Sequence, residues 1–99
     1  MIINIKEELR TISGEVYSDK GNKPLTFKDV LINCCEMYRP EPGVTGMIIK
    51  VYALGTKTFQ GKDKVDYTDE EVELIKKVCE ANPMYVTGVL GAMITIVNK

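Results

Sequence analysis

Hydrophobic residues recur at helical spacing over three stretches of this chain, and each stretch predicts an amphipathic helix. The first runs from about Thr26 to Tyr38, the second from about Thr45 to Gln60, and the third from about Asp69 to Ala81. A fourth helix is predicted from about Pro83 to Val97, and this segment carries no charged residue. The pattern therefore predicts a mainly α-helical protein with about four helices.

The third helix carries its own start signal. Thr68 is followed three residues later by Glu71, the spacing at which the two side chains cap each other's backbone N–H groups. Acidic residues crowd the first turn and lysines follow, which is the order that the helix dipole favours. The apolar positions fall on one face: Val72, Ile75, Val78 and Cys79.

The second helix has two adjoining apolar faces. The first face consists of Ile48, Val51, Tyr52, Gly55 and Phe59, and the second of Met47, Val51, Leu54 and Thr58.

The N-terminal part has the composition of β-structure. The stretches Ile2–Ile5 and Thr11–Tyr17 contain β-branched residues, and we expect them to pair as a hairpin over about residues 2–18. A Gly-Asn turn follows at residues 21–22. No internal repeat is evident. The chain is thus expected to form a single domain over residues 1–99, with the hairpin followed by a helical part over about residues 26–97.

The uncharged fourth helix allows several interpretations. It can be the core helix of the domain, or it can pack one face on another subunit, because a helix that is apolar all round is covered on more than one side. A third alternative is that Met93–Val97, which is rich in β-branched residues, forms a strand. If the helix meets a second copy in a homo-oligomer, the predicted interface residues are Tyr85, Leu90, Ile94 and Ile96.

Composition and charge narrow the range of partners and compartments. The chain has 99 residues and a formal net charge of −1, which argues against nucleic acid or an anionic membrane as partner. The apolar stretch at the start is too short for a signal peptide, and the C-terminal one is too short to span a bilayer. Three cysteines, two of them adjacent, do not suggest a disulfide framework. We therefore expect a cytoplasmic protein.

The absence of histidine removes several mechanisms. The chain has no Ser-His or Cys-His pair and no histidine-containing zinc site. Cys34 and Cys79 lie on predicted helical faces, where a buried thiol is the simpler interpretation. The glycines at Gly43 and Gly46 lack the Lys-Ser/Thr pair of a phosphate-binding loop, and the acids near Asp66 lack calcium-loop spacing. We predict no catalytic residue, no metal ligand and no cofactor.

Several motifs together resemble small proteins encoded by phages and prophages. That group shows a "K-P-L" opening, a capped "L-T-x-E-E" helix with "L-I-K-K", and a "V-V-G" final helix, in this order. Here Tyr67 replaces the leucine and Thr87 the second valine. The resemblance covers about residues 20–95 and implies a viral or mobile-element origin, with no known activity. The matching segments are Lys23–Val30, Gly46–Leu54, Val65–Glu71, Leu74–Lys77 and Val86–Leu90.

These observations favour a non-catalytic protein of a bacterial host's cytoplasm, acting by self-assembly and by binding a phage or host protein. One alternative is an enzyme or small-ligand binder that uses tyrosines and carboxylates between subunits. Another is a nucleic-acid-associated regulator, which requires its basic residues to converge on one face: Arg10, Lys50, Lys57, Lys62 and Lys64.

Overall fold

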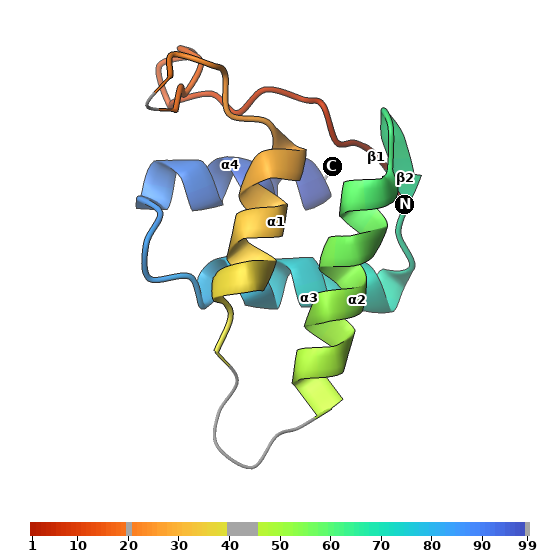
Figure 1. The fold of residues 1–99 in the computed structure, drawn as a ribbon. Helices are drawn as coiled ribbons and strands as arrows, with labels where there is room; N and C mark the ends of the chain where they lie inside the picture. Colours follow the sequence, from red (N-terminus) through yellow and green to blue (C-terminus); the bar gives the residue numbers. More distant parts are fainter. Residues whose placement is uncertain (20, 40–45, 99) are drawn as a thin grey trace.

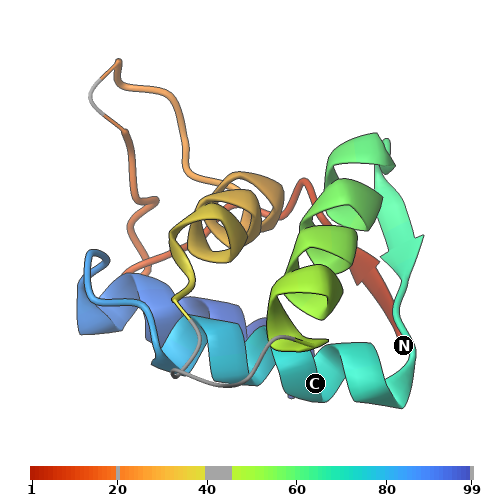
Figure 2. The ribbon, with the colours of Figure 1, turned by 60° about the horizontal axis from the view of Figure 1, so that its bottom comes forward.

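Four helices in two layers make up most of the computed structural model, which describes residues 1–19, 21–39 and 46–98 (Figure 1). Helices α1 (Phe27–Met37) and α2 (Gly46–Gln60) lie side by side and form one layer. Helices α3 (Asp69–Glu80) and α4 (Thr87–Val97) form the other, and Figure 2 shows the first layer stacked across it. The mainly helical class with four helices is confirmed for the described part of the chain.

Side-chain caps set the start of two helices, and that of α3 is the one predicted above. Thr26 caps α1, its hydroxyl accepting a hydrogen bond from the backbone N–H of Asp29 at 3.3 Å. Thr68 accepts from Glu71 N–H at 3.2 Å, and the Glu71 carboxylate accepts from Thr68 N–H at 2.9 Å, which completes the capping box of α3. The predicted start of α2 at Thr45 lies outside the described residues.

Helix α4 begins later than the sequence predicts. The Asn82 side chain accepts hydrogen bonds from Met84 N–H at 2.8 Å and Tyr85 N–H at 2.9 Å, so a single capped turn forms after Asn82. The extended backbone of Val86 (φ −68°, ψ 155°) then interrupts this turn, and α4 starts at Thr87. From there it remains helical to Val97, so the alternative of a C-terminal strand is wrong.

The small sheet pairs two segments that are distant in sequence. Strand β1 (Ile2–Asn4) lies antiparallel to β2 (Lys64–Asp66), with Ile3 opposite Val65 and both side chains buried. The hairpin predicted over residues 2–18 is therefore wrong in its pairing. Burial of Ile3 against Val65 fixes β1, whereas the stretch that was expected to pair with it is held in a turn of its own.

Residues 8–26 contain an eight-residue repeat that the sequence analysis missed. In the first turn, Thr11 N–H donates to Glu15 C=O at 2.6 Å and the Thr11 hydroxyl accepts from Glu15 N–H at 3.1 Å. Eight residues on, Asp19 and Lys23 make the same two contacts, at 2.8 and 3.0 Å. Each turn also has a residue with positive φ at the equivalent place, Gly14 (95°) and Asn22 (60°).

Three backbone hydrogen bonds close this segment into a ring. Leu9 N–H donates to Leu25 C=O, Leu25 N–H to Tyr17 C=O, and Tyr17 N–H to Leu9 C=O, at 2.8, 2.8 and 2.9 Å. The segment just before the ring also satisfies the start of α1, because the carbonyls of Ile5 and Glu7 accept from the first N–H groups of that helix at 2.9 Å each. The N-terminal third of the chain is thus anchored to the helices.

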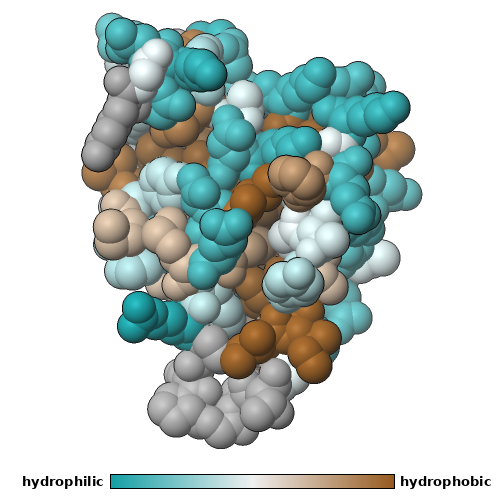
Figure 3. Space-filling model, in the orientation of Figure 1, coloured by the Kyte–Doolittle hydropathy of each residue, from teal (hydrophilic) through white to brown (hydrophobic). Residues whose placement is uncertain are grey.

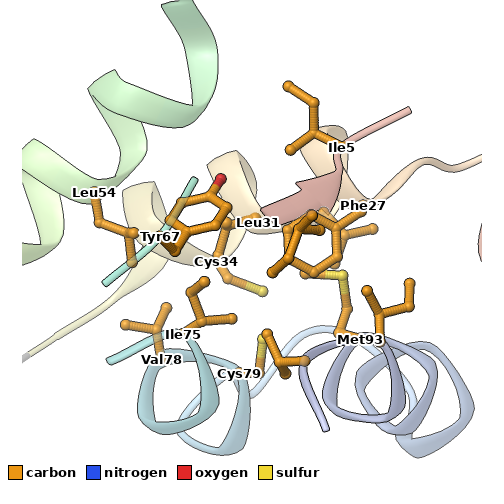
Figure 4. Close-up of a cluster of buried hydrophobic side chains, with 14 of the residues drawn as sticks. Ile5, Phe27, Leu31, Cys34, Leu54, Tyr67, Ile75, Val78, Cys79 and Met93 are labelled. Carbon is orange, nitrogen blue, oxygen red and sulfur yellow. The ribbon is translucent and has the colours of Figure 1, made fainter. Parts of the chain in front are cut away.

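The core lies between the two helical layers (Figure 4). Phe27, Leu31 and Cys34 point from α1 toward α3 and α4, where they meet Ile75 and Met93 among others. These side chains are at most 1% exposed. None of the helices in the described residues is both long enough and apolar enough to cross a membrane.

Candidate functional site

A groove of about 590 Å³ runs along the junction of α1 and α2 and is the candidate functional site. Hydrophobic side chains gather along this junction and at the lower end of α2 (Figure 3). Helix α1 and its C-cap contribute Ile32, Cys35, Glu36 and Tyr38, and α2 contributes Ile48, Val51, Tyr52, Gly55, Thr56 and Phe59. We call this surface the α1–α2 groove.

Helix α2 is apolar on its outer side as well as on the side that faces the core. Val51, Leu54 and Thr58 are buried, as expected for the inner side. On the outer side Tyr52 is 76% exposed, Phe59 68% and Ile48 57%. Such large side chains are rarely gathered on a surface without a binding role.

The outer side chains of α2 form a regular line. Residues at intervals of four, three and four fall in register on one side of a helix. We call this line the α2 stripe, and it consists of Ile48, Tyr52, Gly55 and Phe59. Among the described residues, nine large hydrophobic side chains are exposed. Four of them belong to α2, namely three residues of the stripe and the neighbouring Ile49. No other element carries so many, so the binding potential is concentrated on this helix.

Gly55 determines the depth of the groove. A Cβ atom at this position would lie 3.2 Å from Cys35 Cβ, which is closer than most real Cβ contacts. Helices α1 and α2 therefore approach closely at Gly55, and the floor of the groove there is backbone rather than side chain. The result is a depression with Tyr52 and Phe59 on either side of it along α2.

Four of the seven aromatic residues of the chain lie on or beside this face. Tyr38, Tyr52 and Phe59 line the groove, and Phe59 also borders an adjoining hollow of about 740 Å³ that contains Tyr85. The Tyr85 hydroxyl accepts a hydrogen bond from the Asn33 side chain at 2.8 Å. Tyrosine and other aromatic residues are enriched in the parts of protein interfaces that contribute most to affinity.

The polar chemistry of the groove is sparse. Glu36 is the one charged residue among its lining residues, all of which belong to the described part of the chain. Burial, together with the nearby Cys34 and Glu36, raises the pKa of the Cys35 thiol to about 12, so the thiol is protonated near neutral pH. A protonated thiol is a poor nucleophile. The arrangement is better suited to apolar contact than to acid–base or nucleophilic chemistry.

The other two cysteines belong to the core. Cys34 and Cys79 are buried and bring their sulfur atoms toward each other between α1 and α3 (Figure 4). The contact with Cys34, together with burial, raises the pKa of the Cys79 thiol. Within the described residues, no group of three or more His, Cys, Asp or Glu side chains is arranged to hold a metal ion.

The lysines of α2 are engaged on the side away from the groove. Lys50 lies 3.5 Å from the Glu70 carboxylate and Lys57 lies 2.7 Å from that of Glu71. Burial alone would raise the pKa of Glu71, but hydrogen bonds from Lys57 and from the capping residue Thr68 lower it overall. Two of the five basic residues required for a nucleic-acid surface are thus paired with carboxylates.

The residues predicted to form an oligomer interface are all at least partly covered within the chain. Ile96 belongs to the core and is 8% exposed. Leu90 and Ile94 are half-buried against the core, and Tyr85 precedes α4 beside Asn33. The interface assignment of all four residues stays a prediction, and Ile96 has little exposed surface to contribute to it.

The groove residues of α2 were recognised in the sequence as apolar, but their exposure was not, and those of α1 were mostly missed. The apolar periodicity of α2 identified the face that contains the α2 stripe. Periodicity cannot tell which of two apolar faces a neighbouring element covers. No protein-family model, curated protein or solved structure matches this chain.

Proposed function

We propose that this protein acts by binding other protein chains rather than by catalysis, and that the α1–α2 groove with the α2 stripe is its binding surface. The observation that carries this proposal is the exposure of Tyr52 and Phe59 at 76% and 68% beside an apolar groove. We further propose that the first partner is a second copy of the chain, so that the protein is a homo-oligomer.

The exposed area supports a protein partner. An aromatic side chain can bury about 150–250 Å², so Tyr52 and Phe59 at their exposed fractions offer roughly 200–350 Å² together. With Ile48 and Ile49 added, the exposed apolar area reaches the few hundred Å² of the largest patch on a typical monomer. This area is about half of the ~800 Å² that each partner buries in a standard interface. The polar surroundings of the patch would supply the remainder as a rim.

The motifs shared with phage and prophage proteins over about residues 20–95 support the biological setting. We propose that the protein originates from a phage or prophage and acts in the cytoplasm of the bacterial host. In that setting the homo-oligomer serves as an assembly factor or engages a further phage or host protein.

Light scattering after size-exclusion chromatography tests self-association at concentrations from about 1 to 500 μM. We compare wild type with Tyr52→Glu, which places a charge on the binding surface, and with Ile12→Glu, which places one at a fully exposed position away from it. Wild type and Ile12→Glu should form oligomers as concentration rises, whereas Tyr52→Glu should stay monomeric with an unchanged circular dichroism spectrum.

Two results would contradict this function. A wild type that is monomeric over the whole range excludes self-association. Equal association of Tyr52→Glu and wild type places the contact elsewhere. A side chain that is central to an interface contributes about 2 kcal/mol or more, so the expected loss of affinity is at least about 30-fold.

A further inference from the structure

The spacing of the residues in the α2 stripe is the same from either end of the helix. Its intervals of four, three and four residues are unchanged when the order is reversed. If two copies of α2 lie antiparallel about a two-fold axis, Ile48 of one copy meets Phe59 of the other, and Tyr52 of one meets Gly55 of the other. Antiparallel helices with this spacing pack by inserting side chains of one into spaces of the other.

The sizes of the opposed residues are complementary. Tyr52 is the most exposed residue of the stripe, and Gly55 has no side chain and forms the floor of the groove. The groove volume of about 590 Å³ has room for an aromatic side chain over this floor. The largest projection on one copy thus faces the deepest point on the other, and the two-fold axis repeats the match.

Charge favours a second copy as the occupant. The stripe contains no charged side chain, so two stripes can approach without repulsion along the contact line. Lys50 and Lys57 lie to the side of the stripe and contact Glu70 and Glu71 of their own chain. Antiparallel helices also place the positive end of each helix dipole beside the negative end of the other.

We infer that two copies of the chain pair through antiparallel α2 helices about a two-fold axis, with Tyr52 of each copy inserted over Gly55 in the α1–α2 groove of the other. This inference rests on the proposed function, since it specifies how the partner occupies the same surface. Each groove is completed by a residue of the second copy.

Cross-linking with a short bis-maleimide tests the arrangement. All variants carry Cys35→Ser, because Cys35 lines the groove, whereas Cys34 and Cys79 are buried. Ile48→Cys and Phe59→Cys chains, made at different lengths to distinguish them on a gel, are mixed in equal amounts. Antiparallel pairing predicts that the mixed 48–59 product exceeds both like-with-like products several-fold, and a chain with Ile12→Cys should give only background product.

Dipolar distances between spin labels provide a second measurement that leaves the stripe intact. The labels are attached at Gln60→Cys, because Gln60 is exposed. This position lies about six and a half residues along α2 from the two-fold axis, so antiparallel pairing places the backbones of the two labelled residues about 22 Å apart. Parallel pairing would bring them to about 10 Å.

The outcomes separate this inference from the proposed function. A dimer in which like-with-like products dominate, or in which the Gln60→Cys labels lie near 10 Å, overturns the antiparallel arrangement and leaves self-association standing. A dimer that gives no 48–59 product also overturns it. A wild-type chain that is monomeric by light scattering refutes the proposed function itself.

Discussion

The buried contact between Thr58 and Tyr67 allows a quantitative test of how α2 is held against the core. Thr58 is fully buried; its hydroxyl lies 3.0 Å from the Leu54 carbonyl, to which it donates, and 2.7 Å from the Tyr67 hydroxyl. A threonine hydroxyl has one hydrogen, and a carbonyl can only accept. The Tyr67 hydroxyl must therefore donate to Thr58, and each group depends on the other.

Removing either partner leaves a buried polar group without its hydrogen bond. Tyr67→Phe leaves the Thr58 oxygen without its donor, and Thr58→Val leaves the Tyr67 O–H without an acceptor. Each change should lower the free energy of unfolding by about 1–3 kcal/mol. The double variant replaces both groups with apolar groups of similar shape, which is far less costly than the sum of the two single losses. We expect a coupling energy of about 1–2 kcal/mol.

Urea and thermal unfolding followed by circular dichroism measure these losses. For a chain of this length, a change of 1 kcal/mol shifts Tm by about 4–8 °C. The control is Thr95→Val, because Thr95 makes the same type of bond to the Gly91 carbonyl at 2.8 Å but is exposed, so it should change stability little. If the two single losses add to that of the double variant within about 0.5 kcal/mol, the hydroxyls do not depend on each other and the reasoning is refuted.

Three further predictions follow from the backbone and from titration. Burial first, and then the nearby Glu71 carboxylate, raise the pKa of Tyr67 from 10.0 to about 12. The folded chain then keeps the Tyr67 proton after the unfolded chain has lost it. The contribution of this group to the free energy of unfolding is therefore fully present below pH 10 and should fall by about 2–3 kcal/mol toward pH 12. An equal alkaline loss in Tyr67→Phe, measured by urea unfolding, would contradict this. Gly91→Ala should raise stability by about 0.5–1 kcal/mol because its Cβ meets open space, whereas Gly88→Ala collides with the Tyr17 hydroxyl and should give a lower Tm than Gly91→Ala. Thr68→Ala should cost about 1 kcal/mol in the same unfolding assay, and an unchanged Tm would mean that the α3 cap contributes nothing.

The elements that could be predicted from the sequence are those with local signals. The capping pair at Thr68 and Glu71 and the apolar spacing of α3 depend only on residues a few positions apart, and the structure has both. Strand β2 gives no such local signal, because three residues with one apolar member carry too little pattern. Its strand character depends on Ile3, a residue far away in the sequence.

The eight-residue repeat was missed for a different reason. Its two turns share backbone geometry while their side chains differ: Thr11 corresponds to Asp19, and Gly14 to Asn22. Threonine and aspartate can both accept the same backbone N–H, and glycine and asparagine both tolerate positive φ. A comparison by physical role rather than by residue identity would have found the repeat.

The candidate site was not predicted from the sequence, although the apolar residues that α2 contributes to it were recognised. The face of α2 that contains Tyr52 and Phe59 was recognised as apolar, while the uncovered surface was expected on α4. In the structure the segment over residues 7–12 borders a hollow beside α4, and the outer side of α2 is left open. Which apolar face is covered depends on where the N-terminal segment lies, and that position is set by the long-range pairing of β1 with β2.

That pairing also constrains how the chain can fold as it is synthesised. Strand β1 leaves the ribosome before its partner β2, which follows about sixty residues later. Until then, Ile3 has no Val65 beside it, and the carbonyl of Asp63 that accepts from Ile5 N–H is still missing. A nascent chain that ends with α2 therefore lacks the contacts that position its own N-terminus, and the domain can complete its fold only after the middle of the chain has emerged.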